Sequence, residues 1–154
     1  MTGARRPLLV AAAVLSFAAV ALALVSQHVF DMQPCPWCVL QRLIFVVIGV
    51  VCLVALAAPR AGGAVVLLLC VCGIAAALWQ HFVAASSDSC DLTLAERIVS
   101  AVGLDGLAPE VFQARASCAE AAVSMLGVPY EFYSLALFVV LAALAWRVLA
   151  RRAG

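Results

Sequence analysis

The stretch QPCPWCVLQRLIFVVIGVVCLVALAA, residues 33–58, decides the fold because a cysteine pair runs directly into a long apolar segment. Residues 39–58 carry a single charge, on Arg42, and are long enough to cross a bilayer core at about 1.5 Å per residue. No water is present in lipid to bond the backbone, so such a segment must be helical. We therefore expect a membrane helix that has a Cys-x-x-Cys motif at its start.

Composition extends this expectation to the whole chain. Hydrophobic residues make up 68% of the sequence and charged residues 11%, and the mean hydropathy is +1.19, which leaves too little polar surface for a soluble domain. Three more apolar runs have the length of a membrane span: 7–26, 64–83 and 132–149. We expect an all-α integral membrane four-helix bundle, a single membrane domain over 1–154, with outer (periplasmic) loops at 27–38 and 84–130.

Arginine gives the topology, because the chain has no lysine. Six of its nine arginines fall on one side of a four-helix arrangement: Arg5, Arg6, Arg60, Arg147, Arg151 and Arg152. All eight acidic residues fall on the other side. The positive-inside rule then predicts that both termini are cytoplasmic and that two loops face outward, a short one at 27–38 and a long one at 84–130. A cleaved signal peptide is the alternative for the first run, but its apolar stretch is long for that role.

Two other function classes lack their expected signs. No basic patch with interleaved aromatic residues indicates nucleic-acid binding. A transporter is disfavoured because no acidic residue lies in the middle of a span and no internal repeat is visible. We expect the chain to contact membrane lipid and no nucleic acid.

Four of the seven cysteines lie in the predicted outer loops, where disulfides persist: Cys35, Cys38, Cys90 and Cys118. Four cysteines allow three pairings, and the sequence does not choose among them. As a resting state we expect the disulfides Cys35–Cys38 and Cys90–Cys118. A bridge across two intervening residues closes almost no loop and removes little unfolded-state entropy. The first pair is therefore better suited to cycling between dithiol and disulfide than to stapling, whereas stapling stays open for the second.

The sequence disfavours a metal site, and it predicts a structural role for the three remaining cysteines. A four-thiolate zinc site would sit in an oxidising compartment with no second Cys-x-x-Cys or histidine pair, so we expect no metal. Cys52, Cys70 and Cys72 lie inside predicted spans, where free cysteine behaves as a small buried hydrophobe.

Two polar residues at the outer ends of spans are candidates for binding a ligand. Arg42 follows Cys38 by four residues, so both lie on one helix face, where a guanidinium favours the Cys38 thiolate and offers hydrogen-bond donors to a carbonyl oxygen. His81 ends the third run at a similar depth and could donate a proton or a hydrogen bond to the same ligand. The alternatives are an arginine that snorkels to the headgroups and a histidine in an aromatic belt.

The second outer loop is too long to be a mere connector. Asp91 or Thr93 is expected to cap a short helix that runs to about Val102, with an apolar face able to lie on the membrane surface. Cys90 precedes this helix and Cys118 follows it, so both cysteines could move.

Together these features resemble the DsbB family of bacterial inner-membrane enzymes. "PCPWCVLQR" resembles the family's Pro-Cys-x-x-Cys-x-x-x-Arg, and "SCAEAAVSMLG" resembles its Cys-Ala-Glu stretch followed by Leu-Gly before the last span. The resemblance covers nearly the whole chain. It implies a cytoplasmic (inner) membrane enzyme that reoxidises a periplasmic dithiol oxidase of the DsbA type, a thioredoxin-fold protein.

The resemblance also implies an electron path. Cys90–Cys118 would take electrons from the reduced partner, with Cys90 as the site of the mixed disulfide. Cys118 would attack Cys35 and release Cys38 as a thiolate. Cys38 would pass electrons to a quinone, ubiquinone or menaquinone, held near Arg42, and His81 matches the family's histidine near the end of span three.

Two alternatives remain beside this one. The vitamin K epoxide reductase family also couples thiols to quinones in a four-helix protein, but it places its Cys-x-x-Cys near the last span. A membrane protein whose loop disulfides only staple it would need neither turnover nor a quinone. Redox activity of Cys35–Cys38 separates these possibilities.

Overall fold

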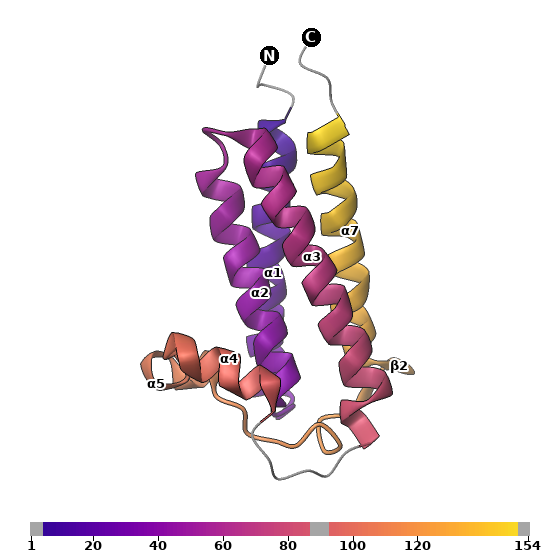
Figure 1. Ribbon diagram of the computed structural model, residues 1–154. Coiled ribbons are helices and arrows are strands. Elements are labelled where there is room, and N and C mark those ends of the chain that lie inside the picture. Colours follow the sequence, from indigo (N-terminus) through magenta and orange to yellow (C-terminus); the bar gives the residue numbers. More distant parts are fainter. Residues whose placement is uncertain (1–4, 87–92, 151–154) are drawn as a thin grey trace.

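Four long helices form the body of the protein in the computed structural model, which describes residues 5–86 and 93–150 (Figure 1). They are α1 (Arg6–Val29), α2 (Pro36–Val54), α3 (Pro59–Phe82) and α7 (Tyr130–Ala150). Each of the four is long and apolar enough to cross a membrane. The predicted all-α membrane bundle is therefore confirmed.

The helices follow one another around the bundle. Helix α1 packs on α2, α2 on α3, and α3 on α7 in the most extensive contact, while α7 also returns to α1. The start of α1, the turn between α2 and α3, and the end of α7 lie at one end of the bundle. The short connection between α1 and α2 and the described parts of the long loop between α3 and α7 lie at the other (Figure 1). This arrangement gathers the loop cysteines and the outer ends of all four helices in one place.

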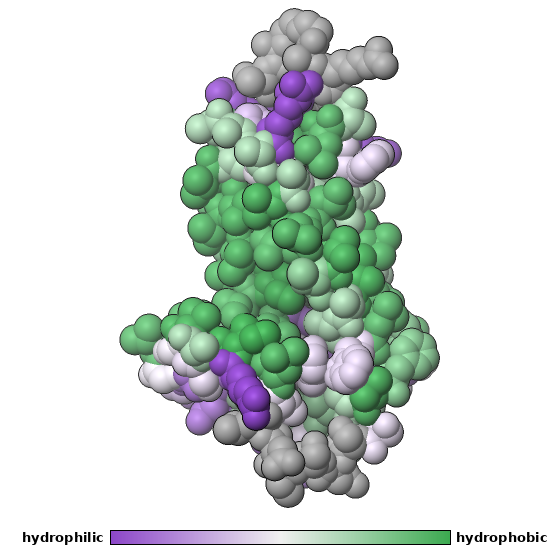
Figure 2. All heavy atoms as spheres, in the orientation of Figure 1, coloured by the Kyte–Doolittle hydropathy of each residue, from purple (hydrophilic) through white to green (hydrophobic). Residues whose placement is uncertain are grey.

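The outside of the bundle is apolar. Figure 2 shows a continuous hydrophobic band over the helices, with polar residues gathered toward the two ends. Large hydrophobic side chains that are mostly exposed occur on all four helices and include Val14, Leu22, Val54, Leu68 and Val139. Burial of such a surface in water-free lipid removes the cost of exposing it, so the bilayer is the natural solvent for this fold.

Helix α2 begins inside the cysteine motif, three residues before the start of the predicted run 39–58. It ends at Val54, four residues before the end of that run. Cys35 is the N-cap: its sulfur accepts a hydrogen bond from the backbone N–H of Cys38 at 3.3 Å. Pro36 occupies the first helical position, where its missing N–H costs nothing. Cys38 consequently lies in the first turn of α2, within the helix rather than before it.

The turn between α2 and α3 also differs from the predicted boundaries. Helix α3 begins at Pro59, not at residue 64, because a proline fixes a helical φ at the first position. Ala58 before it has φ −133° and ψ 70°, since the residue preceding proline is driven out of the helical region. Hydropathy could not place this boundary because the apolar composition continues through it.

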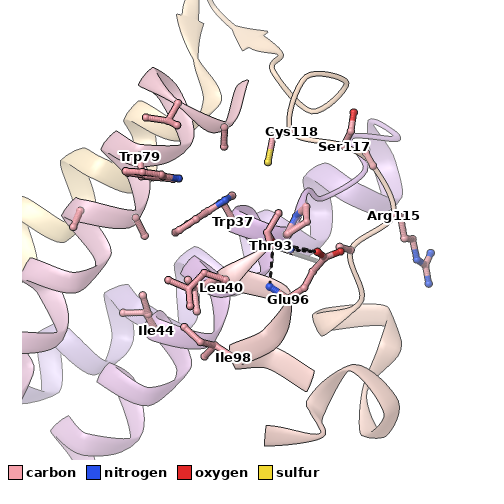
Figure 3. A pocket seen from close by; sticks show the side chains of 18 of the residues that line it. Trp37, Leu40, Ile44, Trp79, Thr93, Glu96, Ile98, Arg115, Ser117 and Cys118 are labelled. Carbon is pink, nitrogen blue, oxygen red and sulfur yellow. Dashed lines mark hydrogen bonds between the residues drawn. The ribbon is translucent and has the colours of Figure 1, made fainter. Parts of the chain in front are cut away.

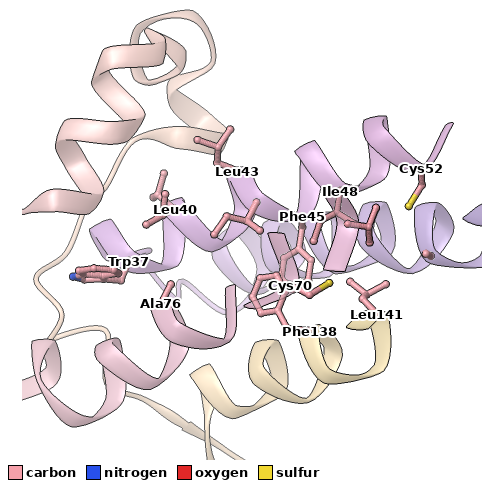
Figure 4. Close-up of a cluster of buried hydrophobic side chains, with 14 of the residues drawn as sticks. Trp37, Leu40, Leu43, Phe45, Ile48, Cys52, Cys70, Ala76, Phe138 and Leu141 are labelled. Carbon is pink, nitrogen blue, oxygen red and sulfur yellow. The ribbon is translucent and has the colours of Figure 1, made fainter. Parts of the chain in front are cut away.

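An aromatic stack fills the centre of the bundle (Figure 4). Phe45 of α2 and Phe138 of α7 lie 4.1 Å apart between ring centroids with planes 3° from parallel. Gly73 of α3 lets the Phe138 ring approach its backbone closely, since a Cβ there would clash with the ring. Cys52 and Cys70 are fully buried in the same core, as expected, whereas Cys72 is exposed on the outside of α3.

The long loop folds into short elements beneath the bundle. The 3-10 turn η1 (Ala84–Ser86) ends α3, and the loop continues through α4 (Leu94–Val102), α5 (Leu104–Leu107), α6 (Pro109–Phe112), β1 (Ser124–Met125) and β2 (Val128–Pro129). The two strands pair antiparallel and lead into α7. Helix α4 packs on α2 and projects sideways from the bundle (Figure 1).

Helix α4 confirms the predicted loop helix. Thr93 and Glu96 form a reciprocal capping box, and Gly103 ends the helix with a left-handed φ of 72°. Ala95 and Val99 are buried beneath it. Its other apolar side chains, among them Leu94, Ile98 and Val102, remain exposed, as a helix lying on a membrane surface requires.

Candidate functional site

The Cys-x-x-Cys pair lies at the outer end of the bundle, where α2 begins. The Sγ atoms of Cys35 and Cys38 are 2.9 Å apart, so a disulfide of about 2.05 Å needs only a small side-chain movement. Cys35 is fully buried and Cys38 partly buried. The helix start fixes both sulfurs, because Cys35 caps α2 and Cys38 sits in its first turn.

Cys118, from the long loop, is brought to the same place. The backbone N–H groups of Arg115 and Ala116 donate to the carbonyl of Pro34 at 3.0 and 3.3 Å, which ties the second loop to the first beside the motif. Cys118 is buried, and its sulfur is a hydrogen-bond partner of Cys35. The three cysteine sulfurs are thus neighbours, although Cys118 is 80 residues from Cys38 along the chain.

A small turn orients Cys118. The backbone N–H of Ser117 donates to the Glu120 carboxylate at 2.8 Å, and the backbone N–H of Glu120 donates to the Ser117 hydroxyl at 3.2 Å. The Ser117 hydrogen bonds lower the pKa of the exposed Glu120 carboxyl, so it is charged at neutral pH. These two bonds explain physically why a Cys-Ala-Glu string serves to position a cysteine.

The contact between Cys118 and Cys35 separates their acidities. The Cys35 thiol donates toward Cys118, which raises the pKa of Cys35; Cys38 and burial raise it further. The same hydrogen bond, helped by the backbone N–H of Trp37, lowers the pKa of Cys118. Cys118 is therefore the more nucleophilic partner, and it faces Cys35.

Cys90 and the predicted Cys90–Cys118 pairing lie outside the described residues. Among the residues that are described, no three histidine, cysteine or acidic side chains gather in a way that could hold a metal ion.

A polar network surrounds Cys38 on the side away from Cys118. Gln80 of α3 donates from Nε2 to the Cys38 sulfur at 3.2 Å. Gln41 donates in turn to Gln80 Oε1 at 2.8 Å. Both glutamines are buried. Gln80 was not among the predicted site residues, because its one signal in the sequence is that it is a polar residue beside His81 in an otherwise apolar run.

Arg42 points into the bundle rather than toward the headgroups. One of its terminal nitrogens donates to Gln27 Oε1 at 2.7 Å and to the Val111 carbonyl at 3.2 Å, and the other donates to the Ala23 carbonyl at 3.3 Å. The residue is only 6% exposed. Its guanidinium therefore links α1, α2 and the loop, which argues against the snorkelling alternative and holds a cation near Cys38.

A cavity of about 370 Å³ opens beside these groups. Helices α1, α2, α3 and α7 contribute its walls, which are mainly apolar and include Cys38, Gln41 and Arg42. Its lining includes Leu22 of α1 and Phe30, which follows the end of α1, and both side chains are well exposed on the outside of the protein. Apolar walls with a few convergent polar groups are typical of a site for a small ligand, here one that can arrive from the lipid.

His81 lies at the outer end of α3 but does not line this cavity. Its Nδ1 atom is 2.6 Å from Oε1 of Glu131, the second residue of α7. Glu131 does line the cavity and is 5% exposed. The predicted histidine is thus connected to the cavity through the Glu131 carboxyl group, which was not among the predicted site residues.

A second, larger hollow of about 1080 Å³ lies on the loop side of the motif (Figure 3). Trp37 and Trp79 lie in its wall with ring centroids 6.2 Å apart, and Cys118 points into it from the loop. Glu96 of α4 closes another side. The loop cysteine therefore borders a hollow with the volume of a ligand or peptide site.

Comparison with known proteins agrees with this geometry. The family model described as disulfide bond formation protein DsbB matches residues 5–148. The chain belongs to the DsbB family. The match covers α1, α2 and α3 completely, α7 as far as Val148, and all four predicted outer cysteines.

Individual DsbB relatives match over most of their length. A disulfide bond formation protein B from Herminiimonas arsenicoxydans is 32% identical over 142 residues, which cover 89% of this chain and 90% of the relative. Proteins of the same name from Ralstonia nicotianae and Stutzerimonas stutzeri are 36% and 32% identical, and the matches cover 84% and 86% of this chain and 84% and 87% of theirs. Membership in the DsbB family decides against the vitamin K epoxide reductase alternative.

Proposed function

We propose that this protein is a disulfide-generating membrane oxidoreductase that oxidises a DsbA-type dithiol protein and passes the electrons to a membrane quinone. One observation carries the proposal. The Cys35–Cys38 pair stands between two different surroundings, with the loop cysteine Cys118 on one side and a lipid-accessible cavity at Cys38 on the other. Membership in a family named for disulfide bond formation supports the reaction class.

The first half of the reaction is thiol–disulfide exchange. In the resting protein, Cys35–Cys38 and Cys90–Cys118 are disulfides. A thiolate of the reduced partner attacks Cys90, forms a mixed disulfide and releases Cys118 as a thiolate. Cys118 then attacks Cys35, so the Cys35–Cys38 bond breaks and Cys38 leaves as a thiolate.

The exchange completes without any outside oxidant. The partner's second thiol attacks the mixed disulfide, which leaves the partner oxidised and frees Cys90. Cys90 then attacks Cys118, which restores Cys90–Cys118 and leaves Cys35 and Cys38 as a dithiol. Two electrons have moved from the partner to the pair at the membrane edge.

The second half re-forms the Cys35–Cys38 disulfide. The cavity would hold a quinone, which would supply a two-electron acceptor there, so the net reaction would be partner dithiol plus quinone giving partner disulfide plus quinol. Cys38 gives up the electrons as a thiolate that Gln80 stabilises by a hydrogen bond, and Arg42 provides a cation beside it. The residues fit a quinone headgroup: the walls are mainly apolar, and the lining includes the Arg42 guanidinium and the Gln41 and Gln80 amides, whose N–H groups are donors for carbonyl oxygens.

The same proposal places the protein in the bacterial inner membrane with both termini in the cytoplasm and both loops in the periplasm. The distribution of arginine supports this orientation. So does the gathering of the helix ends, with the start of α1 and the end of α7 on the side opposite the loops. Disulfides persist in the periplasm, where the loop cysteines would then act.

The decisive experiment is anaerobic quinone reduction. The protein, purified in detergent, is mixed with a reduced DsbA-type protein and a soluble ubiquinone or menaquinone analogue, and the loss of quinone absorbance is followed. We expect turnover that disappears in Cys38→Ser, and the preferred analogue identifies the quinone class.

Two results would overturn the proposal. Full turnover in Cys38→Ser would break the electron path at its central step. If well-folded, unaltered protein shows no turnover with any analogue or partner, the loop disulfides only staple the fold. The exposed Arg97→Ala variant, on the outer face of α4, is the matched control and should turn over normally.

A further inference from the structure

A buried acid and a half-exposed base form a pair where α3 ends and α7 begins. Nδ1 of His81 and Oε1 of Glu131 are 2.6 Å apart. The His81 side chain is 31% exposed, whereas that of Glu131 is 5% exposed. The pair therefore runs from the outer surface of the protein into its interior.

The inner end of this pair opens on the cavity at Cys38. Glu131 is one of the residues that line it. Its second carboxyl oxygen, Oε2, is buried, and no group in the described part of the chain hydrogen-bonds to it. A buried carboxyl oxygen without a partner costs free energy, so its retention calls for a ligand or a function.

The proposed function creates a need for protons at this place, and the inference rests on that function. Cys38 delivers electrons as a thiolate, so its proton has already left when the electrons move. The quinol product needs two protons on its oxygens. The cavity walls are mainly apolar, so a protein group must carry the protons in.

We propose that Glu131 is the proton donor for the ligand bound in this cavity and that His81 refills it from the outside. A proton enters at the exposed side of the His81 ring, and the Nδ1 proton crosses the 2.6 Å contact to Oε1 of Glu131. The carboxyl group then turns and gives this proton to the ligand oxygen as negative charge develops there. Two passages supply the two protons from the outer solution, and the one proton that the Cys35 thiol loses as the Cys35–Cys38 disulfide re-forms is released to that solution.

Other titratable groups facing the cavity are less suited to this role. The lining groups that carry titratable or charged atoms are Cys38 and Arg42 from α2 and Tyr130, Glu131 and Tyr133 from α7. Among the described residues, α1 and α3 contribute none to the lining. The Tyr130 hydroxyl donates to Ser26 and the Tyr133 hydroxyl to the Met125 carbonyl, so both hydroxyl protons are engaged. Glu131 remains as the acid with an oxygen free to meet the ligand.

The test separates proton delivery from electron delivery. Glu131→Gln keeps the shape of the side chain and a hydrogen bond to His81 but cannot carry an exchangeable acid proton. We expect quinone reduction to slow by about a hundredfold, the usual scale of a lost general acid. Glu131→Asp should recover much of the rate, and Asp105→Asn, a carboxyl-to-amide change on α5, should leave it unchanged.

A second measurement needs no quinone. The chain has two histidines, so ¹⁵N-histidine labelling gives an NMR spectrum with His81 and His28 as mutual controls. We expect Glu131→Gln to move the ring resonances of His81 and to leave those of His28 in place. Unchanged His81 resonances would show that the two side chains do not interact, which would overturn the inference.

Failure of this inference is distinguishable from failure of the proposed function. If the unaltered protein does not reduce quinone, the function itself is wrong. If it does and Glu131→Gln keeps the full rate, only the proton route is wrong. If Glu131→Gln also weakens binding of a quinone analogue in a thermal-shift assay, or slows thiol exchange between Cys118 and Cys35, its role is structural and the inference falls.

Discussion

Gln80 donates a hydrogen bond from its side-chain amide to the sulfur of Cys38 at 3.2 Å, across the contact between α3 and α2. Gln41 donates to the oxygen of the same amide at 2.8 Å, so the two glutamines form one hydrogen-bonded chain that ends at the sulfur. If the Gln80 amide alone were turned over, its Nε2 would face Nε2 of Gln41, and its oxygen, an acceptor, would face the Cys38 sulfur. The network therefore presents an N–H to Cys38, which favours the thiolate over the thiol.

Removal of this donor should slow the electron transfer while leaving the fold intact. A hydrogen bond to a charged group is worth about 1.5 kcal/mol or more, so Gln80→Leu should lower the rate of quinone reduction by roughly tenfold. Single-turnover loss of quinone absorbance measures it. Gln113→Leu, at an exposed position, is the control; an equal rate in both variants would contradict the role of Gln80.

Arg42 should matter for both stability and binding. Its three hydrogen bonds to Gln27, Val111 and Ala23 connect separate elements, so Arg42→Ala should destabilise the protein by about 2–3 kcal/mol. The apparent KM for quinone should rise as well, because a donor is lost from the cavity wall. Thermal melting and steady-state kinetics check the two effects. A stable variant with an unchanged KM would mean that the guanidinium serves neither purpose.

The aromatic stack makes a stability prediction that does not involve the cysteines. A Cβ at Gly73 would clash with the Phe138 ring, and Phe138 is held against Phe45. Gly73→Ala should therefore cost about 1–3 kcal/mol in the free energy of unfolding, the usual range for overpacking a core. Gly106→Ala is the control, since a Cβ there meets nothing within 4 Å. Equal melting temperatures of the two variants would show that the Phe138 ring can move aside at no cost in stability.

The lowered pKa of Cys118 predicts how its reactivity depends on pH. Because the Cys35 hydrogen bond favours the Cys118 thiolate, alkylation of Cys118 in the reduced protein should have its midpoint below the ordinary thiol value of about 8.5. Cys35→Ala removes this bond, so the midpoint should rise and the rate at pH 7 should fall. Quenched alkylation and mass spectrometry of the Cys118 peptide measure both. Cys52→Ala, deep in the bundle, should leave the midpoint in place.

Substitution of Cys90 should separate oxidation of the partner protein from the reactions of the Cys35–Cys38 pair. Cys90→Ser should abolish oxidation of the reduced partner protein, because the site of the mixed disulfide is gone. It should spare reduction of Cys35–Cys38 by a small dithiol and its reoxidation by quinone. Turnover with the partner in this variant would place the first exchange at another cysteine.

Several features were predictable from local sequence. The four spans follow from apolar runs of bilayer length, and the loop helix follows from Thr93, Glu96 and Gly103, whose cap signals act within a few residues. The ends of α2 and the start of α3 were misplaced by up to five residues. Pro36 and Pro59 set the starts of the two helices, because proline favours the first helical position. The limits of an apolar run do not show this preference.

The sequence by itself determined that the chain is a membrane bundle with a redox-type cysteine pair at its outer edge, because hydropathy and motif spacing are local properties. Only the tertiary structure decided what surrounds that pair. Gln80 and Glu131 come from α3 and α7, far from Cys38 along the chain, and meet it or its cavity only when the helices pack. Side chains that come together across a bundle leave no pattern in a single sequence, since nothing in their local spacing depends on the contact.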